Sequence, residues 1–228
     1  MAFYLPQGVE FFPHPLFADP DGLLAIGTDL SPSQILLAYQ FGIFPWNHED
    51  DPVLWWYTHP RCVLFPSRLK ISKSMKQLLN KESFKVTFDT SFPEVIEACQ
   101  NVKRKGQEDT WITGQLINIF TELHHQGYAH SVEVWQDDKL VGGLYGLSLG
   151  KIFYGESMFS RANNASKYGF IKLVQFLKKN DFELIDCQQR TEHLISLGAE
   201  MISSESFYKQ LKSNIFNIVS PCKWVYQE

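Results

Sequence analysis

Residues 141–167, VGGLYGLSLGKIFYGESMFSRANNASK, decide the fold of this chain. Apolar residues over 141–147 and 152–159 predict the two strands of a hairpin, with its turn at 148–151. The polar run 161–166 is typical of a helix start. Glycines within the first strand indicate a bulge or a close approach to the backbone. We therefore expect a hairpin that leads into a helix and forms the floor of a binding cleft.

The segments on either side of this hairpin alternate between strand and helix patterns. Residues 1–61 are rich in proline, glycine and aromatic residues, and they hold a short strand at 22–27 and a helix at 32–41. We expect an α+β (mixed α/β) fold, with a small N-terminal domain over 1–61 and a GNAT-like acyltransferase domain over 62–228. The GNAT analogy comes from the order of elements, an antiparallel meander followed by a helix and a strand. Further strands are predicted at 62–66, 84–89, 130–136 and 184–188, and helices at 72–80, 92–100, 114–126, 167–180, 192–197 and 206–212.

Charge is unevenly distributed along the 228 residues. The first 60 residues carry seven acids and no Lys or Arg, whereas residues 61–105 carry ten bases and four acids. A basic block in a chain of net charge −4 suggests an anionic partner. A solvated helix face explains the charge equally well, so charge alone leaves both interpretations open.

Cysteine spacing and the N-terminus indicate the type of protein. The four cysteines form no CxxC pair, so zinc and thioredoxin-type chemistry are not expected, and reduced, buried thiols are. The N-terminus lacks a basic segment and a long apolar run, and no 18-residue apolar stretch occurs. We expect a cytoplasmic protein that binds no metal.

Two acidic positions are candidates for proton transfer. Alternation along strand 184–188 predicts that Asp186 and Gln188 share one face and could address one ligand. A strand end tied to a neighbouring loop is an equal alternative. Glu156, among apolar residues, would be costly to bury unpaired, and a structural ion pair with Arg161 is slightly favoured over a role in ligand binding.

Aromatic and basic residues suggest contact with nucleic acid. Tryptophans on loops can stack on bases, although two or three of Trp46, Trp55, Trp56, Tyr57 and Trp111 are expected to be packing residues. A surface that contacts phosphates is one use of the basic block, and solubility is the other. Its members are Arg68, Lys70, Lys73, Lys76, Lys81 and Lys85, together with the Lys103-Arg104-Lys105 run.

Taken together, these motifs resemble the bacterial leucyl/phenylalanyl-tRNA–protein transferases from about residue 20 to residue 200. The first twenty residues and the C-terminus are less diagnostic. The motifs are GLLAIG at 22–27, DLSP at 29–32, Tyr39, GIFPW at 42–46, LWW at 54–56, TWIT at 110–113, HSVEVW at 130–135, VGG at 141–143, GESMFSR at 155–161, NASK at 164–167, LIDCQ at 184–188, His193 and SLGA at 196–199.

The resemblance implies an aminoacyltransferase that moves Leu or Phe, and weakly Met, from aminoacyl-tRNA to the α-amino group of proteins with N-terminal Arg or Lys, marking them for degradation. An aminoacyl ester is already activated, so no cofactor is expected. Asp186 would accept a proton from the attacking α-ammonium group, directly or through Gln188. Gln188 would hold the reacting groups in line, and Glu156 would orient them or bind the ribose. Trp46 and Trp111, with Tyr39 nearby, would bracket the terminal adenine. The apolar side-chain pocket would consist of Leu144, Phe153, Gly155, Met158, Leu173 and Ile185, and the residues of the 68–85 block would contact the acceptor-stem phosphates.

Two rival functions remain open. A coenzyme A-dependent N-acetyltransferase would need a glycine-rich turn before the helix, and residues 161–166 contain no glycine. An RNA-binding module without catalysis would tolerate loss of Asp186. Neither membrane nor DNA is expected as a partner.

Overall fold

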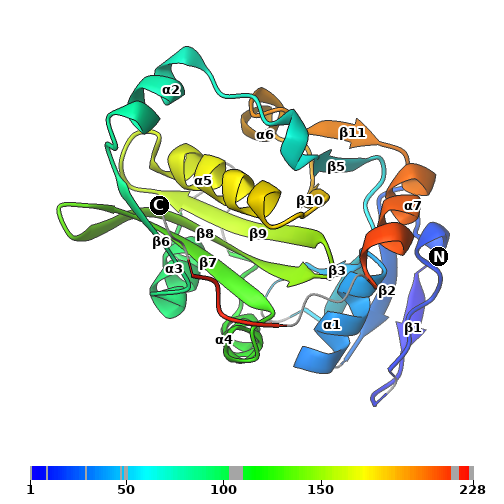
Figure 1. The fold of residues 1–228 in the computed structure, drawn as a ribbon. Coiled ribbons are helices and arrows are strands. Elements are labelled where there is room, and N and C mark those ends of the chain that lie inside the picture. Colours follow the sequence, from blue (N-terminus) through cyan, green and yellow to red (C-terminus); the bar gives the residue numbers. More distant parts are fainter. Residues whose placement is uncertain are drawn as a thin grey trace.

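The computed structural model describes residues 2–8, 10–28, 30–46, 48, 51–102, 110–216 and 221–225. It contains a small sheet near the N-terminus and a large sheet covered by helices on both faces (Figure 1). The predicted mixed α/β class is therefore confirmed. The Lys103-Arg104-Lys105 run lies outside the described residues.

The elements follow one another in nearly the order that the sequence predicts. They are β1 (Phe3–Leu5), η1 (Pro15–Phe17), β2 (Leu23–Gly27), α1 (Pro32–Gln40), β3 (Phe44–Pro45), β4 (Val53–Trp56), β5 (Arg61–Leu64), η2 (Pro66–Arg68), α2 (Lys73–Asn80), β6 (Lys85–Phe88), α3 (Phe92–Gln100), α4 (Gly114–His125), β7 (Ala129–Gln136), β8 (Lys139–Leu149), β9 (Ile152–Ser160), α5 (Ala165–Lys179), β10 (Leu184–Gln188), α6 (Glu192–Ser196), β11 (Glu200–Ile202) and α7 (Ser204–Asn214). β1 and β11 were not predicted, because three residues are too few to show a periodic pattern.

The large sheet has seven strands in the order β11-β5-β10-β9-β8-β7-β6. β7, β8 and β9 form the predicted antiparallel meander, and β10 then pairs in parallel with β9. The hairpin turn is tighter than expected, since β8 continues to Leu149 and β9 begins at Ile152.

Glycine is required at one point of this hairpin. The register of β8 and β9 shifts between Tyr145 and Gly146. A Cβ atom at Gly146 would lie 2.1 Å from the carbonyl oxygen of Tyr154 and 2.4 Å from the ring of Phe153. The bulge that the glycines predicted is therefore present. At Gly146 the backbones of β8 and β9 lie too close together for a residue with a Cβ atom.

Helices cover both faces of the large sheet, as expected for amphipathic helices that flank a sheet. α5 packs on β7, β8 and β9 from one side, and α2 lies next to α5 (Figure 1). α3 and α4 cover the other side. α4 begins at a Thr113 cap whose side chain accepts a hydrogen bond from the Leu116 amide at 3.2 Å.

The small sheet has the order β1-β2-β4-β3. α1 follows β2, and its Ser31 cap accepts a hydrogen bond from the Gln34 amide at 3.2 Å, as the Ser31-Pro32 pair predicted. Trp55 and Tyr57 are buried, which confirms that part of the aromatic set is core. The small sheet and the face of the large sheet under α3 and α4 share one hydrophobic cluster.

Described residues near the C-terminus are anchored to the large sheet. The Trp224 ring stacks on His130 with centroids 3.7 Å apart, and its amide donates to the Asp89 carboxylate at 2.7 Å. His130 Nδ1 lies 2.9 Å from the same carboxylate. Burial lowers the pKa of His130, so the ring stays neutral. These contacts fix residues 221–225 against the sheet.

Candidate active site

A cleft opens where β9 and β10 separate. The two strands pair as far as Tyr154 and Asp186, and β9 then continues to Ser160 without that partner. The resulting cleft has a volume of about 910 Å³. Its lining includes both polar and apolar side chains: Phe44, Pro45, Trp46, His48, Val102, Trp111, Leu144, Tyr145, Phe153, Gly155, Glu156, Ser157, Met158, Phe159, Ser160, Ser166, Phe170, Ile185, Cys187, Gln188, Gln189, Thr191, His193 and Leu194.

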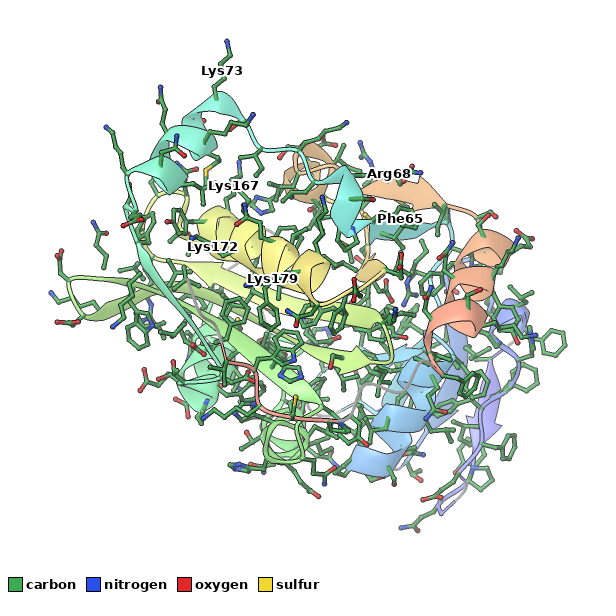
Figure 2. The ribbon with its side chains drawn as sticks, in the orientation of Figure 1. Phe65, Arg68, Lys73, Lys167, Lys172 and Lys179 are labelled. Atoms are coloured by element: carbon green, nitrogen blue, oxygen red, sulfur yellow. The ribbon has the colours of Figure 1, made fainter. Side chains whose placement is uncertain are left out.

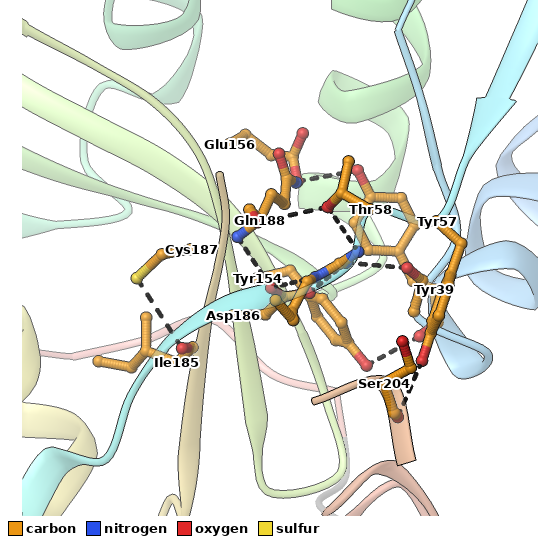
Figure 3. Close-up of polar contacts among 12 residues, drawn as sticks. Tyr39, Tyr57, Thr58, Tyr154, Glu156, Ile185, Asp186, Cys187, Gln188 and Ser204 are labelled. Carbon is orange, nitrogen blue, oxygen red and sulfur yellow. Dashed lines mark hydrogen bonds and ion pairs between the residues drawn. The ribbon is translucent and has the colours of Figure 1, made fainter. Parts of the chain in front are cut away.

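Glu156 is the acid that faces this cleft. Its Oε1 accepts a hydrogen bond from the Tyr39 hydroxyl at 2.8 Å and another from Gln188 Nε2 at 3.0 Å (Figure 3). Burial raises the pKa of Glu156 to about 8, and the hydrogen bond from Tyr39 only partly offsets it. Burial and the nearby carboxylate also raise the pKa of Tyr39, which therefore remains a donor. Glu156 can thus exchange a proton near neutral pH.

The prediction that Glu156 forms an ion pair with Arg161 is wrong. Arg161 Nη1 instead donates to the Leu140 carbonyl at 3.3 Å, and its guanidinium lies 5.2 Å from the centroid of the Phe159 ring. Glu156 has neutral partners because Tyr39 and Gln188 occupy the positions around its Oε1.

Asp186 is fully buried and paired with a cation. Arg61 Nε donates to its Oδ1 at 2.8 Å and Arg61 Nη2 to its Oδ2 at 2.6 Å. Arg61 Nη2 also donates to the Gly42 carbonyl at 2.8 Å. Such a bidentate pair holds the carboxylate in one orientation. Asp186 lies behind the cleft rather than in its lining.

The prediction that Asp186 and Gln188 share one strand face is wrong. The register between β10 and β5 shifts between these two residues, and Gln188 has a φ of 57°. This bulge turns the Gln188 side chain toward Glu156, while its amide donates to Asp186 Oδ1 at 2.9 Å (Figure 3). The two residues are joined through the main chain of Gln188.

The aromatic candidates divide between cleft and core. Trp46 is 39% exposed and Trp111 is 8% exposed, and both line the cleft. Trp56 supports Trp46, since its Nε1 donates to the Trp46 carbonyl at 2.8 Å and the two ring centroids are 5.7 Å apart. Tyr39 is buried and reaches the cleft only through its hydrogen bond to Glu156.

Most residues of the predicted apolar pocket line the cleft. Leu173 is the exception, because it is fully buried in the core beneath α5 and does not line the cleft. Phe170, one turn earlier on the same helix, lines the cleft instead. The predicted residues that do line it are Leu144, Phe153, Gly155, Met158 and Ile185.

The basic block forms an exposed surface. Arg68 pairs with Glu200, and its guanidinium lies 4.8 Å from the centroid of the Phe65 ring. Lys73 projects from α2, and Lys172 and Lys179 lie on neighbouring α5 (Figure 2). The exposed members of the predicted block are Arg68, Lys70, Lys73, Lys76, Lys81 and Lys85. Within the described part of the chain, no three His, Cys, Asp or Glu side chains converge on a possible metal site.

Arg61 was not predicted as a site residue. It begins a strand, β5, whose four residues are all buried. A charged residue in such a strand is costly without a partner, and this was a signal for a buried acid. Its guanidinium lies 5.0 Å from the Phe44 ring centroid and 4.6 Å from that of Phe207, so three segments meet at this side chain.

Family models and curated relatives match most of the chain. The model of the leucyl/phenylalanyl-tRNA protein transferase family matches residues 63–212, and that of its N-terminal domain matches residues 28–59. Curated proteins named leucyl/phenylalanyl-tRNA–protein transferase are similar to this chain. The one from Flavobacterium johnsoniae is 55% identical and covers 89% of this chain and 96% of its own. The one from Christiangramia forsetii is 56% identical and covers 92% of this chain and 100% of its own.

Similar solved structures are more distant. The structure of L-PGS from Bacillus licheniformis covers 83% of this chain and 65% of its own, with 12% identity and a TM-score of 0.40. A GCN5-related N-acetyltransferase from Kribbella flavida covers 73% of this chain and 59% of its own, with 10% identity and a TM-score of 0.35. No helix of the described residues is long and apolar enough to cross a membrane.

Proposed function

This chain belongs to the leucyl/phenylalanyl-tRNA–protein transferase family, and on that premise we propose that it moves a leucyl or phenylalanyl group from charged tRNA to the α-amino group of proteins that begin with Arg or Lys. It is an acyltransferase that uses aminoacyl-tRNA and protein. Methionine is a weaker donor, and the product is marked for degradation. The reaction takes place in the cytoplasm, where charged tRNA is used.

One observation carries the proposal: a single cleft combines an apolar pocket, two tryptophans and a carboxyl group that can exchange a proton near pH 8. The pocket fits an apolar aminoacyl side chain, and Trp46 and Trp111 provide faces on which an adenine can stack. We also propose that residues 1–61 form a small domain that supplies Tyr39 and the cleft residues Phe44, Pro45, Trp46 and His48, while residues 62–228 supply the other lining residues.

Proton transfer is assigned to Glu156. The attacking α-ammonium has an ordinary pKa of roughly 7.7–8.0, which is close to the raised pKa of about 8 of the Glu156 carboxyl. Glu156 accepts one proton from the ammonium group, and the free amine attacks the ester carbonyl. The bond from the carbonyl carbon to the ribose oxygen then breaks, and that oxygen takes the second proton from the attacking nitrogen. A base matched to the acid that it deprotonates works most efficiently.

Asp186 is a positioning residue in this scheme. Both of its oxygens are engaged by Arg61, so accepting a proton would break a buried ion pair. It fixes the main chain of Gln188, and the Gln188 side chain then orients Glu156. This scheme replaces the sequence-based hypothesis, in which Asp186 accepts the proton directly or through Gln188, because Glu156 is now the proton acceptor and Gln188 positions it.

The exposed basic surface is assigned to the acceptor-stem phosphates. Lysines on α2 and near η2 are exposed and face solvent together with those of α5 (Figure 2). Phosphate contacts of this type release counterions, so affinity for tRNA falls as salt rises.

The proposal is tested by incubating the protein with labelled Leu-tRNA and matched peptides that begin with Arg, Lys or Glu. Label is expected in the Arg and Lys peptides and absent from the Glu peptide. Equal labelling of the Glu peptide contradicts the acceptor specificity, and no labelling with any peptide contradicts the transferase. Tight binding of coenzyme A in calorimetry favours an N-acetyltransferase instead. Tight tRNA binding without transfer favours an RNA-binding module.

A further inference from the structure

Two free cysteines face each other across β5 and β10, next to the catalytic cluster. Val63 pairs with Asp186 and Cys62 pairs with Gln188, so the bulge leaves Cys187 beside Cys62. Both side chains belong to the same hydrophobic cluster. Side chains on neighbouring antiparallel positions lie within the separation that a disulfide spans.

The two thiols differ in access and in acidity. Cys62 is fully buried, whereas Cys187 is half-buried and lines the cleft. The hydrogen bond from the Cys187 thiol lowers the pKa of Cys62, and the same bond, with burial, raises the pKa of Cys187. A small reagent therefore reaches the pair from the cleft at Cys187, and the more acidic thiol of the pair, Cys62, lies behind it.

We propose that Cys62 and Cys187 form a redox-responsive dithiol, whose disulfide reversibly inactivates the site. With hydrogen peroxide as the oxidant, the Cys187 sulfur attacks one peroxide oxygen, the O–O bond breaks, and a sulfenic acid and water result. The Cys62 sulfur then attacks the Cys187 sulfur, the S–O bond of the sulfenic acid breaks, and its hydroxyl leaves with the Cys62 proton as a second water. Two thiols lose two electrons and two protons, and one peroxide becomes two waters.

The bulge connects this disulfide to the chemistry of the cleft. Cys187 lies between Asp186, whose Oδ1 accepts the Gln188 amide, and Gln188, whose side chain holds Glu156 (Figure 3). The Cys187 thiol now points to the Ile185 carbonyl, with Sγ 3.9 Å from the oxygen. A bond to Cys62 pulls this sulfur toward β5 and changes the backbone at Gln188. The loss of activity rests on the proposed function, whereas disulfide formation does not.

The chain offers matched controls. Cys99 is buried in α3 and Cys222 is exposed in the segment 221–225, which packs near Gly127. Cys222 is more exposed than Cys187, so it reports on oxidation that is unrelated to the cleft. Cys222→Ser is therefore the control for non-specific damage, and Cys62→Ala removes the resolving thiol.

The test treats the full chain with hydrogen peroxide, blocks the remaining thiols with N-ethylmaleimide, and identifies linked peptides by mass spectrometry. The wild-type and Cys222→Ser proteins are expected to give a Cys62–Cys187 peptide two hydrogens lighter than its separate parts. Their transfer of leucine should fall at least tenfold and return with dithiothreitol. The Cys62→Ala protein cannot form this peptide, so excess peroxide should carry its Cys187 on to the sulfinic acid, which dithiothreitol does not reduce, and its activity should not return.

Three results overturn the proposal: no linked peptide in the wild-type protein, a linked peptide with full transferase activity, or full recovery of the oxidised Cys62→Ala protein. The linked peptide is measured in the wild-type chain, so a Cys62→Ala protein that fails to fold leaves the test intact. A reduced wild-type protein without transferase activity contradicts the proposed function. The linked peptide then still decides whether the dithiol forms.

Discussion

Asp186 and Glu156 are carboxylates of one cluster, and their surroundings differ in a way that separates their roles. Asp186 has a cation, with two hydrogen bonds from Arg61 and one from the Gln188 amide. Glu156 has two neutral donors on one oxygen and forms no ion pair among the described residues. The first is held in place by its ion pair, whereas burial raises the pKa of the second to about 8. One carboxylate is therefore suited to positioning and the other to proton exchange.

Asp186→Ala is expected to have the largest effect, because it leaves Arg61 buried and unpaired. Removing one partner of a buried pair costs about 3–5 kcal/mol of unfolding free energy, measured by urea denaturation. Transfer should be abolished, with little change in donor affinity at temperatures where the protein is folded. Glu200→Ala is the matched control: it breaks the exposed Arg68 pair and should cost at most about 1 kcal/mol. Wild-type turnover in Asp186→Ala refutes the positioning role.

Glu156→Gln should reduce the rate on the order of 10²-fold, since a general base contributes at least that much. Its amide oxygen can still accept from Tyr39 and Gln188, so the fold should be retained. The wild-type rate should rise with pH up to about 8, as the carboxyl loses its proton. A variant that keeps the wild-type rate and pH profile contradicts this assignment.

Glu156→Gln should also change how the free energy of unfolding depends on pH. Because the folded pKa of Glu156 is raised, the folded chain keeps a proton between the ordinary pKa of 4.5 and about 8 that the unfolded chain releases. Stability therefore falls as pH rises through this window. Denaturation across that range should give a flatter curve for Glu156→Gln than for the wild-type protein.

Trp111→Ala tests a residue that bonds to neither carboxylate. One lost stack should weaken aminoacyl-tRNA binding by about 1–3 kcal/mol, read as a higher KM for the tRNA with an unchanged pH profile. Trp135 lies on β7 outside the cleft, with its Nε1 bonded to Thr87. Trp135→Ala should leave the KM unchanged, and an unchanged KM in Trp111→Ala counts against the stacking role.

Tyr39→Phe should have the smallest effect. It removes one of the two hydrogen bonds to Glu156, at a cost of about 1 kcal/mol. Since this bond lowers the pKa of Glu156, its loss should move the rising limb of the pH profile to higher pH. Tyr4→Phe, at a residue 67% exposed on β1, is the control. A shift of the profile to lower pH would show that Glu156 is not the group that titrates.

The long elements of the fold could be predicted from the sequence because each has its own periodic pattern. The meander over 129–160 and helix 165–179 follow from apolar spacing and glycines. The contacts of Glu156 could not be predicted, because the nearest cation in sequence, Arg161, turns to a carbonyl instead. The face of Gln188 was predicted wrongly, since a bulge reverses simple alternation.

Cysteine burial was predicted only in part. None of the four cysteines, all of which lie in the described part of the chain, forms a disulfide. Cys62 and Cys99 are buried, but Cys187 is half-buried and Cys222 is exposed. Spacing along the chain shows that no CxxC motif exists. It contains no information about which cysteines meet across strands, because that depends on the register between β5 and β10.

Arg61 and Asp186 are 125 residues apart in the chain, and this separation determines when the site can exist during synthesis. Tyr39, Arg61 and Glu156 leave the ribosome before β10 does. Closing so long a loop is slow and costs entropy that the pair must recover. A nascent chain that ends before residue 186 holds an arginine with no acid to bind. The hydrogen-bonded cluster of Tyr39, Arg61, Glu156 and Asp186 is therefore completed only when β10 emerges and takes its place between β5 and β9.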